Sequence, residues 1–295
     1  MAADMRGIYP VLGSPFDQQG RLEHAGLRSQ VDFCLKCGAH GLVYPVLGAE
    51  FQFLSEEERQ GGLRTVIGAA EGRVPVVAGV AAPATPLVAA YAMDAAQAGA
   101  QAVIALPPFV SSATPAELFD YYRAIAATGL PVFIQNGQNG MAASFVAELI
   151  DEIELIQYVK EEQPPSAHNL SIVMETLKDK PVGVFGGAFG RWMLSELERG
   201  ACGFMPASDT VDVFVAIWDA WQAGNKEKAR DVFDALVPLI NLYTMLGFAA
   251  FKYMLVKRGV IAHARTRTPG AVELDAEDVR ELDLIWERLG PHLKV

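Results

Sequence analysis

The sequence predicts a (β/α)8 barrel, in which eight parallel strands alternate with helices, and three observations support this. Eight short apolar runs recur along the chain, most gaps between them carry a helical pattern, and repeated small-residue motifs mark where helices return into strands. The eight runs lie near residues 8–12, 41–46, 74–80, 102–106, 131–135, 155–160, 182–185 and 203–206.

The ends of the helices are also marked in the sequence. Three segments that enter an apolar run open with glycine and small residues, as expected of a helix C-cap that turns tightly into a buried strand. They begin at Gly38, Gly99 and Gly200. Residues 55–58 (Ser-Glu-Glu-Glu) and 114–117 (Thr-Pro-Ala-Glu) fit the capping box at a helix start, and Thr85-Pro86 opens another helix.

Beyond the eighth unit, three further helical patterns follow at 226–246, 248–258 and 276–289. No linker rich in Ser, Gly or Pro separates them from the barrel. We therefore expect a single domain over 1–295, with the barrel at about 1–222 and a helical extension at about 223–295. A doubly wound sheet is the weaker alternative, because residues 12–16 do not form the glycine-rich phosphate loop that it would need.

The composition argues against several classes of partner. The 295 residues are 51% hydrophobic and 20% charged, which is normal for a soluble globule, and the formal net charge is −11. We expect no nucleic-acid partner, because phosphates need a basic surface. There is no apolar stretch of membrane-spanning length, and the first six residues are too short and polar for a signal peptide. These features indicate a cytoplasmic protein without a membrane partner.

The cysteines and histidines do not indicate a metal site. Cys34 and Cys37 have the C-x-x-C spacing, but they lie in a helical pattern and no second pair completes a zinc site. The five histidines are scattered without metal-ligand spacing, and three cysteines do not make a disulfide framework. We therefore expect no metal and no other cofactor.

Lys160 is the strongest catalytic candidate. It closes an apolar run that Pro164 and Pro165 soon follow, so the pattern predicts a buried strand with an amine at its carboxyl end, where active sites of barrels lie. A lysine in apolar surroundings loses its proton more easily and can attack a carbonyl. No other lysine lies at a predicted strand end. The alternative is a structural ion pair with Glu161 or Glu162.

Other predicted strand ends carry candidates for binding and proton transfer. Gly48-Ala49 could present backbone N–H groups to a carboxylate, or could simply form a loop before the next helix. Glu50 could be an acid or base, although such residues more often hold a loop by hydrogen bonds. Gly186-Gly187 could let a substrate approach the backbone closely, or could form a tight turn. The remaining candidates are Ser14, Tyr44, Gln135, Asn136, Met205 and Ser208.

With these positions established, the chain resembles the dihydrodipicolinate synthase and N-acetylneuraminate lyase family over essentially its whole length. The most specific elements are Lys160 at the sixth strand and the stretch 50–59. The resemblance implies a barrel with C-terminal helices, usually a homotetramer or dimer of dimers. It also implies that Lys160 forms a Schiff base with a 2-oxo acid. Other matching stretches lie at 7–10, 14–16, 106–109, 135–136, 159–161, 186–187 and 203–206.

The sequence departs from the family's pattern where substrate binds and protons move. The family's Gly-Thr-Thr-Gly-Glu motif is Val-Leu-Gly-Ala-Glu at 46–50, so backbone donors at Leu47 and Gly48 remain to hold a carboxylate. Gln135 replaces a proton-shuttling tyrosine, and an amide is no acid or base at neutral pH. The arginine that would grip a second carboxylate is missing from 137–140. Dihydrodipicolinate synthase activity itself is therefore not expected.

Gln135 and the segments near both ends are similar to a sub-branch that includes L-2-keto-3-deoxyarabonate dehydratases. We therefore expect a metal-free lyase or dehydratase that acts through Lys160 on a small-molecule 2-oxo acid, such as a 2-keto-3-deoxy sugar acid, with Gln135 orienting the substrate or a water. Expected substrate-binding residues are Leu47, Gly48, Asn136, Gly187 and Met205. Candidates for proton transfer, besides a bound water, are Glu50, Tyr44, Ser14 and Ser208.

Two rival functions stay open at this point. The first is an aldolase on the same scaffold, which would make or break a bond between pyruvate and an aldehyde. The second is a binding or regulatory protein that kept the barrel and lost the chemistry, because a fold does not guarantee a function.

Overall fold

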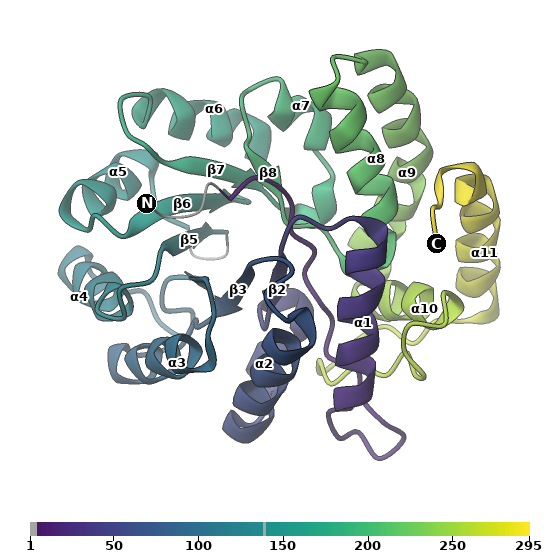
Figure 1. Ribbon diagram of the computed structural model, residues 1–295, viewed down its shortest axis with the longest axis horizontal. Coiled ribbons are helices and arrows are strands. Elements are labelled where there is room, and N and C mark those ends of the chain that lie inside the picture. Colours follow the sequence, from purple (N-terminus) through teal and green to yellow (C-terminus); the bar gives the residue numbers. More distant parts are fainter. Residues whose placement is uncertain (1–4, 138–139) are drawn as a thin grey trace.

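Eight parallel strands form the centre of the protein, in a computed structural model that describes residues 5–137 and 140–295. Figure 1 shows helices arranged around these strands. The strands are β1 (Gly7–Ile8), β2 (Leu42–Tyr44), β3 (Val76–Gly79), β4 (Ala102–Ala105), β5 (Val132–Asn136), β6 (Ile156–Glu161), β7 (Gly183–Gly186) and β8 (Gly203–Phe204). The helices that follow them are α1 (His24–Cys37), α2 (Glu56–Ala70), α3 (Thr85–Ala98), α4 (Pro115–Ala126), α5 (Ala143–Glu152), α6 (Ser166–Thr176), α7 (Met193–Leu197) and α8 (Val211–Gln222).

The strands close into a barrel. Each strand pairs in parallel with its neighbour in the order β1-β8-β7-β6-β5-β4-β3-β2. The remaining seam closes beyond the short β1, where the Leu12 N–H donates to the Val43 carbonyl (3.1 Å) and the Val43 N–H donates to the Pro10 carbonyl (3.0 Å). Every predicted apolar run overlaps one of the observed strands, so the predicted (β/α)8 barrel is confirmed.

Alternation along each strand separates two cores. Side chains of one parity fill the barrel interior, where the Phe133 and Tyr158 rings stack with 4.3 Å between centroids. Side chains of the other parity, such as Ile134 and Val159, pack outward in the layer between strands and helices. This parity decides which residues at the strand ends can face the mouth of the barrel.

The helix boundaries follow the signals in the sequence. The capping boxes of α2 and α4 are both formed, at Ser55 and Thr114. Gly38, Gly99 and Gly200 all adopt positive φ angles (91°, 93° and 93°), which explains why glycine occurs at each return into a strand. The helix predicted from Thr85-Pro86 begins at Thr85.

Three helices complete the chain after α8. They are α9 (Lys226–Leu246), α10 (Phe248–Lys257) and α11 (Ala276–Leu289), and only α10 ends one residue earlier than predicted. Helix α9 packs against α8 and α11, beside the barrel in Figure 1. The segment 258–275 between α10 and α11 returns to the barrel, where Arg267 contacts Gly20 and Phe53 in the loops that follow β1 and β2.

The predicted helix cysteines, Cys34 and Cys37, are buried and free within α1. In the part of the chain that the structure describes, no three His, Cys, Asp or Glu side chains are grouped so that they could hold a metal ion. Among the same residues, no helix combines the length and the apolar character needed to cross a membrane.

Candidate active site

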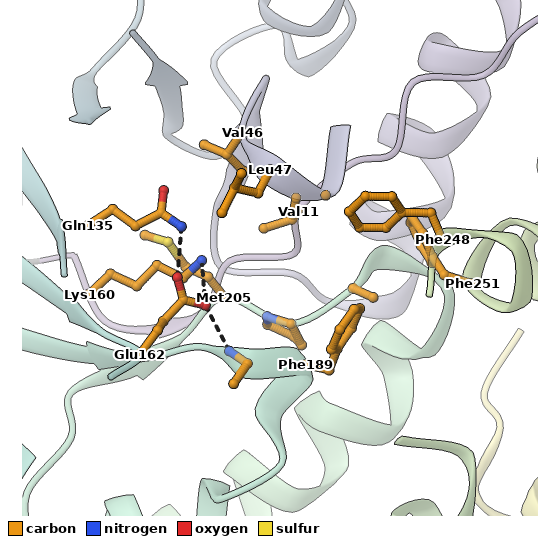
Figure 2. Close-up of a pocket in the computed structure, with 14 residues that line it drawn as sticks. Val11, Val46, Leu47, Gln135, Lys160, Glu162, Phe189, Met205, Phe248 and Phe251 are labelled. Atoms are coloured by element: carbon orange, nitrogen blue, oxygen red, sulfur yellow. Dashed lines mark hydrogen bonds and ion pairs between the residues drawn. The ribbon is translucent and has the colours of Figure 1, made fainter. Parts of the chain in front are cut away.

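Lys160 and Gln135 meet at the carboxyl ends of neighbouring strands. They are registered partners in the β5–β6 pair, so both side chains leave the strands on the interior face. Lys160 is 4% exposed and Gln135 is 2% exposed. They form one side of a cavity of about 240 Å³. The cavity is lined by Val11, Val46, Leu47, Gly48, Gln135, Lys160, Glu162, Ala188, Phe189, Met205, Pro206, Ala207, Phe248 and Phe251 (Figure 2).

Glu162 completes a polar triad with these two residues. Its Oε1 lies 3.2 Å from the Lys160 Nζ, and its Oε2 accepts a 2.7 Å hydrogen bond from the Gln135 Nε2. The Ala188 N–H donates to Oε1 (2.8 Å) from the loop after β7. Figure 2 shows these contacts converging on the Glu162 carboxylate. The ion pair considered as an alternative for Lys160 is thus present, and it lies inside the cavity.

The electrostatics of the triad favour an ionised Glu162. Burial alone would raise the pKa of this carboxyl. The positive charge of Lys160 and the hydrogen bonds from Ala188 and Gln135 outweigh burial and hold the Glu162 pKa below its ordinary value. A carboxylate in hydrogen-bond reach of the lysine is placed to exchange a proton with it.

Our sequence analysis considered Glu162 only as an ion-pair partner and missed it as a proton carrier. The signal was present, because residues two apart on a strand share a face and Glu162 follows Lys160 by two. Residues 138 and 139, which belong to the segment lacking the family's arginine, lie outside the described residues.

The two residues expected to offer backbone donors lie in the loop after β2. Leu47 and Gly48 lie in a short 3₁₀ helix (η1, Leu47–Ala49) and both line the cavity. A Cβ on Gly48 would lie 2.9 Å from the Val11 Cγ1, so glycine permits the close packing of this loop against the end of β1.

Glu50 holds this loop in place from outside the cavity. Its fully buried carboxylate pairs with Lys252 of α10 and accepts hydrogen bonds from the backbone N–H groups of Arg267 and Thr268 (2.7 Å each). With both oxygens occupied and the cavity lined by other residues, Glu50 is not placed for the proton transfer that we expected of it. Its position agrees instead with the loop-holding alternative.

The hydroxyl groups expected to move protons also lie outside the cavity lining. The Ser14 Oγ donates to the Ala49 carbonyl (2.6 Å) and lies 3.2 Å from the Tyr44 Oη. Tyr44 has the outward parity of β2 and packs against α2, where a Cβ on Gly62 would touch its hydroxyl. The Ser208 Oγ contacts the Gln30 Oε1 (3.3 Å). The structure therefore does not place these three hydroxyl groups in the cavity where we expected them.

Asn136 also faces away from the cavity, because it has the opposite parity to Gln135. Its Nδ2 donates to the Glu161 Oε2 (2.7 Å) and the Met141 carbonyl (3.1 Å), so Asn136 does not line the cavity in which we expected it to bind substrate. Met205 lines the cavity as expected. Gly187 is not among the lining residues and packs against Glu162, where a Cβ would come within 2.2 Å of the Glu162 Oε1.

The wall of the cavity away from the triad is aromatic. Phe189 comes from the loop after β7, and Phe248 and Phe251 come from α10. In Figure 2 these rings lie on the side of the cavity away from Gln135 and Lys160. The sequence analysis did not find them, since no local pattern indicates that α10 reaches the mouth of the barrel.

A barrel with a buried lysine at the end of its sixth strand, paired with a carboxylate in a cavity, has the architecture of a lysine-dependent lyase. Comparison with known proteins identifies the family. The model of the dihydrodipicolinate synthetase family matches residues 4–287, and the chain belongs to this family.

Named relatives and solved structures agree with this assignment. The chain is 31% identical to the L-2-keto-3-deoxyarabonate dehydratase of Azospirillum brasilense, over 97% of this chain and 95% of that protein. It is 28% identical to the probable 2-dehydro-3-deoxy-D-pentonate aldolase YjhH of Escherichia coli K12, over 81% and 82% of the two chains. The structure of E. coli K12 YagE, a prophage protein of the same family in complex with pyruvate, superposes with a TM-score of 0.88 at 25% identity, covering 98% and 99% of the chains.

Proposed function

We propose that this protein is a Schiff-base lyase that acts on a 3-deoxy-2-oxo acid with a hydroxyl group at C4. The observation that carries the proposal is the buried amine of Lys160 at a strand end, 3.2 Å from the Glu162 carboxylate inside a cavity. The sequence resemblance and the names of the relatives support the same chemistry, and they favour a 2-keto-3-deoxy sugar acid dehydratase.

The first steps use Lys160 and Glu162. Glu162 takes a proton from the Lys160 ammonium, and the free amine attacks C2 of the substrate, expelling its oxygen as water to form an iminium. The N–H groups of Leu47 and Gly48 hold the substrate carboxylate, and Gln135 orients the substrate. The positive iminium nitrogen acidifies C3, so a base can remove a proton there and leave an enamine.

Dehydration then follows without an external reagent. The enamine electrons expel the C4 hydroxyl, which leaves as water with the proton taken from C3, and a C3=C4 double bond forms. Water hydrolyses the iminium and frees Lys160. Glu162 is the proposed carrier for both proton transfers, because it is the ionisable group beside Lys160 among the cavity-lining residues.

A retro-aldol reaction is the second candidate, and the relative named as an aldolase supports it. Here the base removes the proton of the C4 hydroxyl, the C3–C4 bond breaks, and an aldehyde leaves. The enamine then takes a proton at C3 and is hydrolysed to pyruvate.

Borohydride trapping tests the shared step. The protein is incubated with pyruvate and borohydride, digested, and its peptides are weighed; we expect a reduced adduct on Lys160. Lys160→Ala should form no adduct and show no turnover while it stays folded, and Lys178→Ala, which removes an exposed lysine, is the matched control. Absence of an adduct with pyruvate and with a panel of 2-keto-3-deoxy acids would favour the binding-protein alternative. Product analysis then separates the two reactions, because a dehydratase removes water from the substrate and an aldolase releases pyruvate.

The proposal also extends the family's usual homotetramer and a cytoplasmic location to this chain. Light scattering coupled to size exclusion tests the first, and a monomer at micromolar concentration would contradict it.

A further inference from the structure

We propose that the substrate carries a hydrocarbon group beyond C4, rather than the further hydroxyl groups of a sugar acid. This inference rests on the proposed Schiff-base function, and it departs from the sugar-acid substrate class that the names of the relatives favour. The argument depends on where the cavity offers hydrogen-bond partners and where it does not.

The polar side chains of the cavity lie together on one side. Among the described lining residues they are Gln135, Lys160 and Glu162. Gln135 and Lys160 both contact the Glu162 carboxylate. Lys160 is committed to C2 of the substrate, so Gln135 and Glu162 remain for a hydroxyl at C4. No polar side chain among these lining residues is left for a hydroxyl farther along the chain.

Hydroxyl groups near the mouth of the barrel do not supply the missing partners. Ser14, Tyr44 and Ser208 make hydrogen bonds among themselves or with Ala49 and Gln30, outside the cavity lining.

Part of the backbone of the lining is also engaged. The carbonyls of Val46, Leu47, Ala188 and Pro206 each already accept a hydrogen bond from another backbone N–H group. The Ala188 N–H donates to Glu162. These backbone groups therefore offer few further partners to a substrate hydroxyl.

The opposite wall is apolar and comes from separate segments of the chain. Phe189, Phe248, Phe251 and Val11 line it, and Figure 2 shows the three rings on the side away from the triad. A hydroxyl placed against these side chains would lose its water without a replacement, whereas a methyl or larger hydrocarbon group would be buried favourably.

A matched pair of substrates tests the inference on the unmodified protein. The pair is 4-hydroxy-2-oxopentanoate and 4,5-dihydroxy-2-oxopentanoate of the same C4 configuration, which differ by one hydroxyl at the far end. We expect kcat/KM to be about 10- to 100-fold higher for the compound with the terminal methyl group, as apolar pockets discriminate against an added hydroxyl. Equal values, or a preference for the hydroxymethyl compound, would overturn the inference.

Trapping of pyruvate by borohydride separates this result from failure of the proposed function. Pyruvate has no group beyond C3, so it forms an adduct on Lys160 whether or not the far wall selects hydrocarbon groups. An adduct with pyruvate but no preference between the two substrates contradicts the inference alone, whereas no adduct contradicts the proposed function.

A variant of the aromatic wall provides a second measurement. Phe248 is the first residue of α10 and is half-buried, so Phe248→Gln can place an amide in the wall, with Phe248→Leu as the apolar control. We expect Phe248→Gln to narrow the preference for the methyl compound at least about threefold, and Phe248→Leu to change it by less than about twofold. A folded Phe248→Gln protein with an unchanged preference would contradict the inference. If this variant does not fold, the kcat/KM values of the two substrates on the unmodified protein decide.

Discussion

Glu162 follows Lys160 by two residues, and its Oε1 lies 3.2 Å from the Lys160 Nζ. The spacing places both side chains on the inner face at the end of β6, while Glu161 between them faces outward and pairs with Asn136. Two adjacent glutamates in the sequence therefore belong to different environments. One lies in the cavity beside the amine, and the other lies between the strands and the surrounding helices.

Glu162→Gln should impair catalysis without preventing attack by Lys160. We expect kcat to fall about 10²- to 10⁴-fold, the usual effect of removing a general acid or base. The reduced adduct of pyruvate on Lys160 should still form when the borohydride reaction is run to completion. The measurement is steady-state turnover combined with borohydride trapping.

Glu161→Gln is the matched control for this change, because Glu161 lies on the opposite face of β6. It should retain kcat within about threefold, since it affects neither proton transfer nor the amine. A Glu162→Gln protein with wild-type kcat would assign proton transfer to another group.

Gly187→Ala should act through Glu162. The added Cβ would lie 2.2 Å from the Glu162 Oε1, so the carboxylate must leave its observed position beside Lys160. Because the φ of Gly187 is −141°, alanine causes no left-handed strain there, and the Glu162 side chain must shift from its Cγ, 2.6 Å from the added Cβ, outward. We expect a loss of kcat similar in direction to that of Glu162→Gln, with a stability change within about 1 kcal/mol.

Turnover and urea denaturation of the same preparation check this prediction. Gly68→Ala in α2, where an added Cβ has no neighbour within 4 Å, is the control and should leave turnover unchanged. Unaltered kcat in Gly187→Ala would mean that the observed position of Glu162 is not needed for the chemistry.

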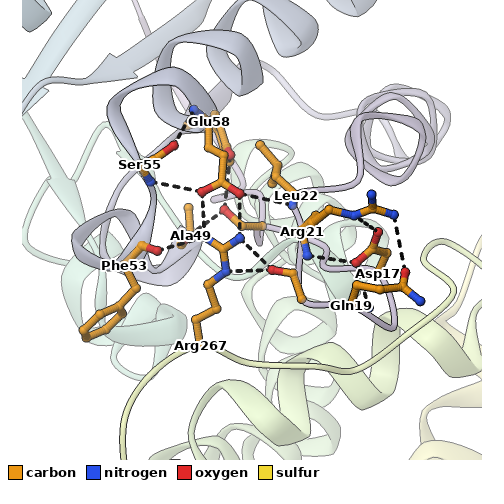
Figure 3. Close-up of polar contacts among 12 residues, drawn as sticks. Asp17, Gln19, Arg21, Leu22, Ala49, Phe53, Ser55, Glu58 and Arg267 are labelled. Atoms are coloured by element: carbon orange, nitrogen blue, oxygen red, sulfur yellow. Dashed lines mark hydrogen bonds and ion pairs between the residues drawn. The ribbon is translucent and has the colours of Figure 1, made fainter.

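Arg267→Met should destabilise the protein in a pH-dependent way. Arg267 binds both carboxylate oxygens of Glu58 and also donates to the carbonyls of Gly20 and Phe53 (Figure 3). The hydrogen bond from Arg267 lowers the pKa of Glu58 to about 2. A lowered pKa means that the pair stabilises the fold fully above pH about 4.5, and that this contribution is lost as the pH falls towards 2.

Urea denaturation at pH 7 and pH 3 measures this effect. We expect Arg267→Met to lower the free energy of unfolding by about 1–3 kcal/mol at pH 7, and by less at pH 3. Arg280→Met, at an exposed pair with Glu277 on α11, should change it by less than about 1 kcal/mol at either pH. A deficit for Arg267→Met that is equal at both pH values would show that the hydrogen bonds to carbonyls, and not the ion pair, account for it.

Glu196→Gln should gain stability relative to the wild-type protein as the pH rises. Glu196 is 1% exposed; its Oε1 accepts from the Ser166 Oγ (2.8 Å), and its Oε2 has no hydrogen-bond partner among the described residues. Burial raises the pKa of Glu196 to about 7, and the negative charges of Glu162 and Glu161 act in the same direction. Between pH about 4.5 and about 7 the folded state keeps a proton that the unfolded chain has lost, so this carboxyl destabilises the fold increasingly with pH.

The measurement is the difference in unfolding free energy between variant and wild type at pH 5 and pH 8. We expect it to shift in favour of Glu196→Gln by about 1–3 kcal/mol over this range. Glu198→Gln, at a side chain 54% exposed, should show a shift below about 0.5 kcal/mol. No shift for Glu196→Gln would indicate that Glu196 is ionised in the folded protein at pH 5.

The sequence by itself determined the elements and the position of the central amine. Apolar runs, capping boxes and C-cap glycines are local signals, and they predicted the alternating strands and helices and placed Lys160 at a strand end. Strand parity was equally local. Applied consistently, it would have added Glu162 to the proton-transfer candidates and removed Tyr44 and Asn136 from the expected site.

The tertiary structure alone decided what surrounds the amine. Glu50 became a loop anchor because Lys252, 202 residues away, pairs with it, and the far wall of the cavity became aromatic because α10 reaches the mouth of the barrel. Such contacts arise when the closing barrel and the C-terminal helices bring distant segments together. Hydrophobic periodicity shows only which face of a segment is buried, and does not identify the segment that it will meet.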